Sequence, residues 1–549
     1  MNVQYAKEVI ELPAGSGGKA ETLLMRLIRA GHYVDAPCGG KGTCGRCRVR
    51  FVSEAPQPTA NERRLLTAEE RSSGVRMACE VCGAEACSLQ LPVSREQKID
   101  VLVTADAADG ENTGQTAGAI PGERDCAAMH NREGAAKIWG HSGKQRCGAA
   151  VDIGTTTLAA TLYDLTERKR IAAASSVNHQ RAYGADVLSR IQAANEGAAE
   201  ELRLSISRDI DALLAGLVAD AGIPDDAVEE LVIVGNTTMC HLLRGLSCAG
   251  LGAAPFTPED LSLWEGSDAE LALSDRWSVS VTILPGISAF VGADIVAGIY
   301  ALEMDRKKNV LLLDIGTNGE IALCHDGRLL CCSTAAGPAL EGAGIYMGMT
   351  ALPGAIDHVY LTGGKITYTT IGGAEAKGIC GSGILDAAAV LLDAGMLDET
   401  GVILEEDHDF LNMITEKDDQ PAVAIGPVIL TQKDIRAIQL AKSAICAGIL
   451  TLLDTAGIQP DEVASFFIAG GFGNYISIPS AVRIGLIPGP LAEKAKILGN
   501  AAAAGAIATL LQESNAGASY SLAEAAQTAD LSSSPIFMDH YMDCMMFPE

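Results

Sequence analysis

The sequence predicts an α/β protein with a small N-terminal domain, a linker and a large body made of two related halves. Three observations support this architecture. Three cysteines and four glycines lie within residues 38–47. Residues 96–147 are rich in Ala, Gly, Asp, Glu and Asn and show no sustained hydrophobic period, which is typical of a flexible linker. After the linker, three glycine-containing segments occur twice in the same order, which indicates an internal duplication.

The first predicted domain covers residues 1–95. Its hydrophobic patterns predict, in chain order, strand over 3–12, helix over 21–30, strand over 48–53, a short helix over 67–73 and further strand over 75–92. We therefore expect a small sheet crossed by one helix, with the cysteines in a loop that follows this helix.

The cysteine-rich loop predicts an iron–sulfur site. Cys38, Cys44 and Cys47 have the spacing C-x5-C-x2-C, and the glycines between them let the backbone turn tightly and point its N–H groups at sulfur. Cys79, which follows Arg-Met-Ala, supplies a fourth thiolate. Four such thiolates suit a [2Fe–2S] cluster, which would make this domain a one-electron carrier.

Two alternatives stay open at this site. Cys44 and Cys47 with Cys79 and Cys82 form two C-x2-C pairs, the spacing of structural zinc, but zinc would leave Cys38 and the glycines without a role. Cys82 or Cys87 could also replace Cys79 as the fourth ligand. Six further cysteines lie in apolar surroundings and are expected to be buried small hydrophobes: Cys240, Cys324, Cys331, Cys332, Cys380 and Cys446.

Charge and composition exclude several classes of partner. The formal net charge of −28 argues against binding to nucleic acid or to an anionic membrane, because both need a basic face. No signal peptide opens the chain and no apolar run of 18 residues occurs, so we expect a cytoplasmic protein. The 16 cysteines are scattered over a long chain, which disfavours a disulfide scaffold.

The duplicated body repeats three landmarks. In the first copy they are Val151–Thr157, Gly235–Thr238 and Leu284–Gly286, and in the second they are Leu313–Glu320, Gly470–Gly473 and Ile487–Gly489. The first two landmarks are 83 residues apart in one copy, from Asp152 to Gly235, and 156 apart in the other, from Asp314 to Gly470. The second copy therefore carries a large insertion, which we expect within residues 346–427.

These landmarks carry residue types suited to a nucleotide. Tight glycine turns expose backbone N–H groups to phosphate oxygens, and threonines add hydroxyl donors. Asp152 and Asp314 end apolar strands, where a carboxylate is costly unless it holds hydrated Mg2+ or orients an attacking water. The candidate ligands of ATP are Gly154, Thr155, Thr156, Thr157, Gly235, Asn236, Thr237, Gly316, Thr317, Asn318, Gly319, Gly470, Gly471 and Gly473.

Other polar and glycine-rich positions have a structural interpretation beside the functional one. Asp294 and Asn500 could be helix caps, and the clusters 341–344 and 378–383 could be helix N-termini or tight turns. The apolar helix expected at 435–453 indicates core. The Met- and Tyr-rich tail, 537–547, is interpreted as a packed extension in which Cys544 stands alone.

Two parts of the chain resemble known families. The N-terminal segment with Cys38, Cys44, Cys47 and Cys79 resembles plant- and adrenodoxin-type [2Fe–2S] ferredoxins, which implies a β-grasp fold with these cysteines as ligands. The paired Asp-Ile-Gly-Thr segments and glycine loops resemble the acetate kinase, sugar kinase, Hsp70 and actin superfamily (ASKHA). That resemblance implies two ribonuclease H-like, actin-like ATPase halves, 148–305 and 306–512, that close over Mg-ATP, followed by a C-terminal extension, 513–549.

The domain order as a whole resembles the reductive activators of corrinoid proteins. This resemblance implies an ATP-hydrolysing reductase that passes one electron from its cluster to Co(II) of a corrinoid protein and so restores Co(I) for methyl transfer, with Asp152 and Asp314 as catalytic residues. The implied partners are a methyltransferase corrinoid subunit or a corrinoid iron–sulfur protein, and a ferredoxin or flavoprotein as electron donor; a homodimer is compatible with the sequence. The alternatives are a redox-sensing small-molecule kinase and an ATP-dependent, chaperone-like assembly factor.

Overall fold

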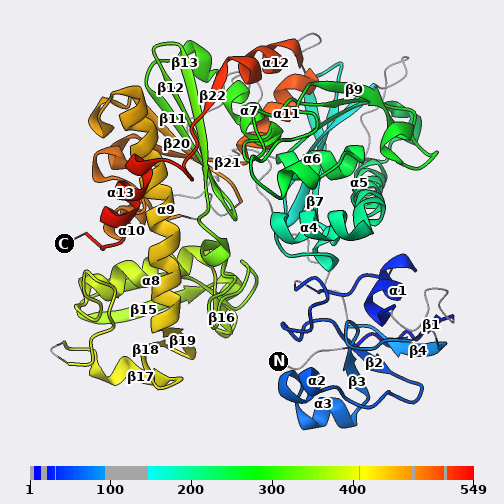
Figure 1. The fold of residues 1–549 in the computed structure, drawn as a ribbon, viewed down its shortest axis with the longest axis horizontal. Helices are drawn as coiled ribbons and strands as arrows, with labels where there is room; N and C mark the ends of the chain where they lie inside the picture. The colour runs from blue at the N-terminus through cyan, green and yellow to red at the C-terminus, as the bar shows by residue number, and fades with distance from the viewer. Residues whose placement is uncertain are drawn as a thin grey trace. The chain divides into compact units, whose positions relative to one another are not determined.

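The computed structural model describes residues 5–13, 21–30, 32–36, 38–83, 85–92, 146–406, 408–471, 476–511 and 516–548 (Figure 1). Almost all of the predicted linker, and Gly473, lie outside the described residues. The described chain forms two compact units. The first contains residues 5–92 together with 146–283, and the second contains residues 284–548.

The N-terminal segment of unit 1 forms a four-stranded antiparallel sheet in the order β1-β4-β2-β3. Its strands are β1 (Ile10–Leu12), β2 (Arg48–Phe51), β3 (Val75–Met77) and β4 (Cys87–Gln90), and its helices are α1 (Leu23–Arg29), α2 (Ala60–Leu65) and α3 (Ala68–Ser72). Leu27, Val49 and Leu89 form part of a core that is fully buried between α1 and the sheet. The predicted sheet with a crossing helix is therefore confirmed.

Two details of this segment differ from the expectation. The strand expected over 75–92 is split into β3 and β4, because the chain turns at Ala78–Glu80, around Cys79. Helix α2 was not predicted. Thr59 caps it and exchanges hydrogen bonds with Glu62, and Thr67 and Glu70 make the same capping box at the start of α3.

The rest of unit 1 is a six-stranded sheet in the order β7-β6-β5-β8-β10-β9. Its strands are β5 (Cys147–Ile153), β6 (Thr157–Asp164), β7 (Lys169–Val177), β8 (Val228–Gly235), β9 (Trp264–Ser267) and β10 (Ser280–Ile283). Its helices are α4 (Val187–Ala193), α5 (Ala199–Ala221) and α6 (Thr237–Arg244). Strands β5, β8 and β10 are parallel, whereas β5, β6 and β7 form an antiparallel meander.

Unit 2 repeats this plan in a sheet ordered β21-β20-β11-β12-β13-β22. Its strands are β11 (Val310–Ile315), β12 (Gly319–His325), β13 (Arg328–Thr334), β20 (Ser465–Ala469), β21 (Ala495–Gly499) and β22 (Ala526–Thr528). Its helices outside the insertion are α7 (Ala293–Ala301), α9 (Gln432–Ala456), α10 (Ile478–Arg483), α11 (Ala501–Leu511), α12 (Ala516–Ala525) and α13 (Pro535–Asp543).

The two large sheets confirm the internal duplication. In each, five strands lie in the spatial order third, second, first, fourth, fifth, and each pair of equivalent neighbours has the same relative direction. The sheets differ at their edges, where β9 joins the fifth strand of one and β22 joins the third strand of the other. Such agreement in order and direction is not expected of unrelated sheets.

The extra residues of the second copy lie between β13 and α9. They form β14 (Ala355–Thr362), β15 (Lys365–Thr370), β16 (Gly378–Ile379), α8 (Gly381–Asp393), β17 (Ile414–Lys417), β18 (Gln420–Ile425) and β19 (Val428–Thr431). These strands make two three-stranded sheets, β15-β14-β16 and β17-β18-β19. Helix α9 runs from the large sheet to this insertion (Figure 1), so one apolar helix stabilises both.

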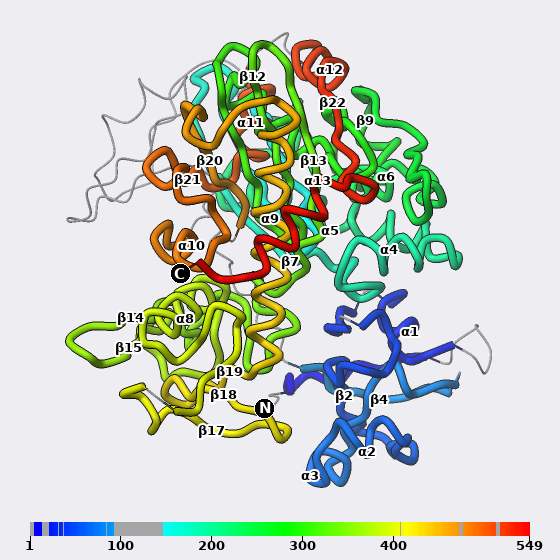
Figure 2. Tube along the Cα trace, turned by 60° about the vertical axis from the view of Figure 1, so that its left-hand side comes forward, coloured from blue at the N-terminus to red at the C-terminus, as the bar shows by residue number. Residues whose placement is uncertain are grey.

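Helix α9 is the core helix that the sequence predicted. By length and composition it could span a bilayer, with a mean hydropathy of 1.4 over 18 residues, but 78% of that window is buried inside the fold. The tail helix α13 lies along it (Figure 2), which confirms a packed extension. Cys544 does not stand alone, however, because its thiol shares a hydrogen bond with the thiol of Cys446 on α9.

Candidate functional site

The loop after α1 and the turn after β3 bring four cysteine sulfurs together. Cys44 Sγ lies 3.3 Å from Cys38 Sγ, and Cys47 Sγ lies 3.3 Å from Cys79 Sγ. Cys47 and Cys79 are buried, whereas Cys82 is exposed. Within the described residues no three His, Cys, Asp or Glu side chains gather as ligands of a single metal ion. The four cysteines that the sequence singled out thus form two neighbouring pairs.

The backbone of this loop is shaped by glycine. Gly39, Gly40, Gly42 and Gly45 all have φ between +59° and +78°, a conformation that other residues rarely adopt. Backbone N–H groups donate to all four sulfurs: those of Thr43 and Cys44 to Cys38, that of Arg46 to Cys44, that of Cys79 to Cys47, and that of Gly42 to Cys79. Paired thiolates with inward N–H donors fit an iron–sulfur cluster of the two-iron type.

Each Asp-Ile-Gly-Thr segment ends its strand in a turn, and we call the two turns, at residues 152–157 and 314–319, the Asp-Gly-Thr loops. In unit 1 the first of these loops follows β5. Asp152 pairs with Val234 of β8 and Ile153 with Gly235, so the register brings the two predicted segments to the same edge of the sheet. Asn236 caps α6 through its side-chain oxygen, and its amide donates to Thr155 Oγ1 at 3.1 Å. The tight turn at Gly154 closes through its N–H to Thr157 O at 3.0 Å.

Two residues that the sequence analysis did not single out bind the carbonyl oxygens of this loop. The side-chain amide of Asn178 donates to Gly154 O at 2.9 Å, and Arg190 Nη2 donates to Thr155 O at 2.5 Å. Both side chains are fully buried, and burial lowers the pKa of Arg190 to about 9. No local sequence signal marks either residue, because the loop that they support lies more than 20 residues earlier.

In unit 2 the equivalent loop leaves the end of β11. Gly316 N donates to Asn318 O at 2.9 Å, and Thr317 Oγ1 donates to Glu341 Oε2 at 3.2 Å. Asp314 pairs with Ala469, which places Gly470 directly beside it. The missing side chain of Gly319 leaves room for Thr334 and Ile445, so this glycine has a packing role.

Further carboxylates surround Asp314. Burial, reinforced by the negative charges of Asp294 and Asp314, raises the pKa of Glu320 well above its usual range. Ser333 Oγ donates to Glu320 Oε1 at 3.2 Å. Asp314 therefore lies in a group of acidic residues whose negative charges act on one another.

The remaining candidates have structural roles. Asn500 Oδ1 accepts from Ala503 N at 2.7 Å and caps α11. Cys380 is the N-cap of α8, and a side chain at Gly383 would collide with Ile356. The tight turn at Gly342 has φ +80° and packs on Met349.

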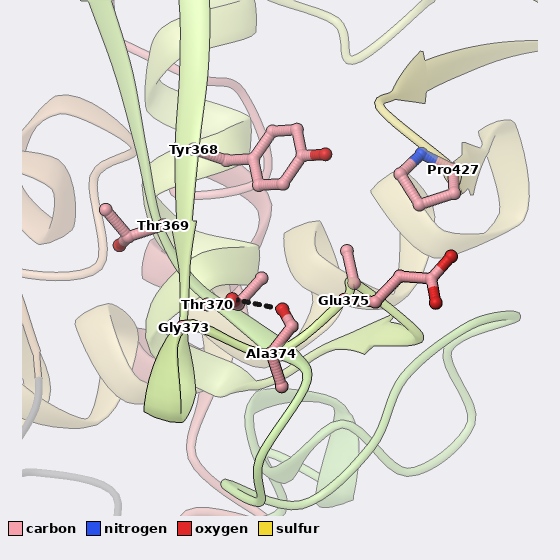
Figure 3. Close-up of a pocket in the computed structure, with 8 residues that line it drawn as sticks. Tyr368, Thr369, Thr370, Gly373, Ala374, Glu375 and Pro427 are labelled. Atoms are coloured by element: carbon pink, nitrogen blue, oxygen red, sulfur yellow. Dashed lines mark hydrogen bonds between the residues drawn. The ribbon is translucent and has the colours of Figure 1, made fainter.

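An open groove of about 730 Å3 lies on the insertion, away from these loops (Figure 3). Tyr368 and Pro427 face each other across it, and Thr370 Oγ1 donates to Ala374 O at 2.6 Å on its floor. None of the candidate ATP ligands lines it. The loops, rather than this groove, hold the residue types that phosphate binding requires.

Two family models match adjacent parts of the chain. The RACo middle region matches residues 147–307, and the C-terminal domain of RACo, the ASKHA domain, matches residues 308–549. The chain belongs to the RACo family of reductive activators of corrinoid proteins. The duplicated sheet of unit 2 is accordingly the actin-like ASKHA domain of this RACo-family protein.

Individual relatives agree with this membership. The chain is 37% identical over 418 residues to the corrinoid activation enzyme RamQ of Eubacterium limosum, covering 73% of this chain and 70% of RamQ. It is 28% identical over 417 residues to the Co(II) methylated amine-specific corrinoid protein reductase of Methanosarcina barkeri, covering 67% of this chain and 70% of that reductase. A shorter match, 34% over 76 residues, is to one component of the Na+-translocating NADH-quinone reductase of Chlamydia pneumoniae, and it covers 14% of this chain and 16% of that component.

One solved structure is similar over nearly the whole RACo-family chain. It is a reductive activator for corrinoid, iron–sulfur protein, 28% identical, with a TM-score of 0.68 and coverage of 97% of both chains. The order of parts found here, from the cysteine loop to the ASKHA domain, is thus similar to that of a solved activator.

Proposed function

We propose that this RACo-family protein is an ATP-dependent reductase that passes one electron from a [2Fe–2S] cluster to Co(II) of a corrinoid protein, so that the cluster is oxidised and the cobalt is reduced to Co(I). The observation that carries the proposal is that one chain holds both the paired cysteine sulfurs and two matching Asp-Gly-Thr loops. The names of its relatives, a corrinoid activation enzyme and a Co(II) corrinoid protein reductase, support the choice of acceptor.

Cys38, Cys44, Cys47 and Cys79 would hold the cluster through their sulfurs, which lie in two close pairs. When bound, the cluster supplies a site for one electron at low potential. The loop N–H groups that donate to these sulfurs stabilise negative charge and so tune that potential. The exposed Cys82 and the half-buried Cys87 take no part in this assignment.

ATP would be bound by the two Asp-Gly-Thr loops and their neighbours. The N–H groups of Gly154 and Gly316 close the turns, so the other backbone N–H groups of the two loops and the hydroxyls of Thr155, Thr156 and Thr157 would donate to phosphate oxygens. Asp152 and Asp314 would hold hydrated Mg2+ or orient the water that attacks the γ-phosphate. Gly471 has open space beside its backbone, because a Cβ atom built on it would meet no other atom within 4 Å. This space would admit the nucleoside.

The difference in reduction potential between the cluster and its acceptor gives a reason for coupling the electron transfer to ATP. Plant-type clusters have potentials near about −400 mV, and each ~59 mV of shortfall costs about 1.4 kcal/mol for one electron. An acceptor that lies ~200 mV lower would cost about 4.6 kcal/mol, which a nucleotide-driven change can offset. We further propose a low-potential ferredoxin or flavoprotein as electron donor, and a cytoplasmic location for the reaction.

The test combines the full chain carrying its cluster, a chemical reductant and Mg-ATP with a Co(II) corrinoid methyltransferase subunit, and follows Co(I) by its visible spectrum. We expect Co(I) only when ATP is present. Cys44→Ala and Asp314→Asn should each abolish its formation, the first by removing the cluster and the second by removing ATP hydrolysis.

The same variants separate the alternatives. An assembly factor would still act after Cys44→Ala, and a sensor kinase would turn over ATP steadily by phosphorylating a small substrate, with no corrinoid protein present. Co(I) formation without ATP, or by the Cys44→Ala chain, would contradict the proposed function.

A further inference from the structure

The first Asp-Gly-Thr loop is tied to a second segment of unit 1 by two buried side chains. Asn178 and Arg190 hold the carbonyl oxygens of Gly154 and Thr155, and the backbone N–H of Asn178 donates to Thr156 O at 2.9 Å. Three consecutive carbonyl oxygens of the loop are therefore bound by these two residues. A change in the loop on binding phosphate must either move them or strain these bonds.

The same two residues also shape the segment 178–184. Asn178 Oδ1 accepts from Gln180 N at 3.0 Å and so caps the 3-10 turn η1 (His179–Ala182). Arg190 Nε donates to Gly184 O at 3.0 Å, and its Nη1 donates to Gln180 Oε1 at 3.3 Å. Because Arg190 has no exposed surface, it cannot exchange these partners for water.

The segment 178–184 in turn contacts the start of the cysteine loop and the residues just before it. The ring of His179 meets the ring of Tyr33 edge-on, with centroids 4.4 Å apart. Asp209 holds His179 in place through Nδ1 at 2.5 Å and the backbone N–H at 2.9 Å. A carbon added to Gly39, next to Cys38, would lie 2.7 Å from Tyr183 O.

Charged and polar side chains extend this contact within unit 1. The pairs are Asp35 with Arg181 at 3.9 Å, Arg29 with Glu201 at 3.6 Å, and Lys41 with Gln192 at 3.4 Å. Each pair has at least one exposed or half-exposed member and is individually weak, so the contact as a whole is one that can open and close.

We infer that Asn178 and Arg190 are positioning residues that couple two places in unit 1. They transmit the binding of nucleotide at the Gly154–Thr157 loop to the contact between segment 178–184 and the residues around the cysteine loop. This inference rests on the proposed function, since it requires that the loop binds nucleotide. Nucleotide binding shifts the contact between Tyr33 and His179, and so changes how freely the cluster-bearing segment leaves the body to meet an acceptor.

Linkage makes the coupling measurable from both ends. If nucleotide weakens the contact by a given factor, then loss of the contact strengthens nucleotide binding by the same factor, which for coupled sites is typically about 5–150-fold. Tyr33→Ala removes the ring that meets His179 without touching the Asp-Gly-Thr loop. It should therefore change nucleotide affinity from a distance.

The experiment measures hydrogen exchange of the full chain with its cluster, with and without a non-hydrolysable Mg-ATP analogue, and reads the peptides that cover 32–41 and 178–184. We expect nucleotide to change exchange in both segments by about fivefold or more. Arg190→Lys keeps the charge but loses the fork that joins three carbonyl and amide oxygens, so the change at 32–41 should fall by at least half while the analogue still binds.

A matched control is Arg203→Lys, since Arg203 also donates to a backbone carbonyl, Glu270 O at 2.9 Å, but this carbonyl belongs neither to the loop nor to segment 178–184. It should leave the nucleotide response at 32–41 unaltered. If Arg190→Lys fails to fold, Tyr33→Ala supplies the second test through its shift in analogue affinity, measured by calorimetry.

The possible outcomes are distinct. Binding of the analogue by the wild-type chain without any change at 32–41, or an unchanged response in Arg190→Lys together with unchanged affinity in Tyr33→Ala, would overturn the coupling and leave the proposed function intact. Failure of the wild-type chain to bind the analogue at all would overturn both.

Discussion

Asp314 Oδ1 lies 2.7 Å from the point at which a side chain on Gly470 would place its first carbon, and Ile315 O is closer still. Gly470 also has φ +99°, which disfavours any other residue. We predict that Gly470→Ala displaces the Asp314 carboxylate and lowers ATP hydrolysis at least about tenfold, the equivalent of about 1.4 kcal/mol in the barrier.

The next glycine provides a control for the steric effect of the added methyl group on the fold. Gly471 has no atom within 4 Å of an added carbon. Gly471→Ala should therefore leave the thermal stability of the chain close to wild type, whereas Gly470→Ala should lower it. Equal ATPase rates in Gly470→Ala and in the wild-type chain would show that Asp314 does not need its present position.

The fourth cluster ligand can be decided by two substitutions. Cys79 is buried with its sulfur 3.3 Å from Cys47, whereas Cys82 is exposed on the next turn of the chain. We predict that Cys79→Ser loses the visible absorbance and the low-temperature paramagnetic signal of the reduced cluster, and that Cys82→Ser retains both. An intact signal in Cys79→Ser with loss in Cys82→Ser would reassign the ligand.

The insertion contains a histidine whose charge stabilises the fold. His358 Nδ1 lies 2.8 Å from Asp386 Oδ2, and Ser480 Oγ donates to the other oxygen of this buried carboxylate at 2.6 Å. The hydrogen bond to Asp386 raises the pKa of His358 above its ordinary value of 6.5. The folded state therefore binds more protons than the unfolded state in the interval between these two pKa values.

The sign of the pH effect follows from that difference. The stabilisation by protonated His358 is complete below pH 6.5 and is lost as the pH rises through the raised pKa of the folded state. We predict that the Tm difference between the wild-type chain and His358→Gln shrinks from about pH 6 to about pH 9. Ser480→Ala, which removes an uncharged donor, should lower Tm by a similar amount at both values.

Helix α9 holds the C-terminal tail through a buried lysine. Lys442 donates to Cys544 O and to Met546 O, and Gln439 and Ser443 bind the carbonyl oxygens of Met545 and Cys544. Burial lowers the pKa of Lys442 to about 8. Lys442→Met keeps the length of the side chain but leaves these carbonyl groups short of a donor.

We predict that Lys442→Met lowers the free energy of unfolding by about 1.5–3 kcal/mol, the usual contribution of hydrogen bonds to a charged group, and exposes the tail to proteases. The control is Lys433→Met, the same substitution at an exposed position of the same helix. Denaturant unfolding and limited proteolysis check both. A tail that is equally resistant in the two variants would show that α9 does not anchor it through Lys442.

Much of the fold followed from short-range patterns in the chain. The alternation of apolar strands and glycine turns predicted both copies of the duplicated sheet, because strand period and turn chemistry are local properties. Helix α2 was missed although Thr59 and Glu62 form the same capping box as Thr67 and Glu70, so its signal was present in the sequence. The cysteine spacing and the loop glycines likewise predicted which sulfurs come together.

The sequence by itself determined the cysteine loop, the duplication and the residues of the two Asp-Gly-Thr loops. The tertiary structure alone decided that Asn178 and Arg190 hold the first loop and that Cys544 meets Cys446. The physical reason is range. Turn and period preferences act over a few residues, whereas these contacts join residues that are neighbours only after the sheet, α9 and the tail have packed, and no local preference of the chain encodes that packing.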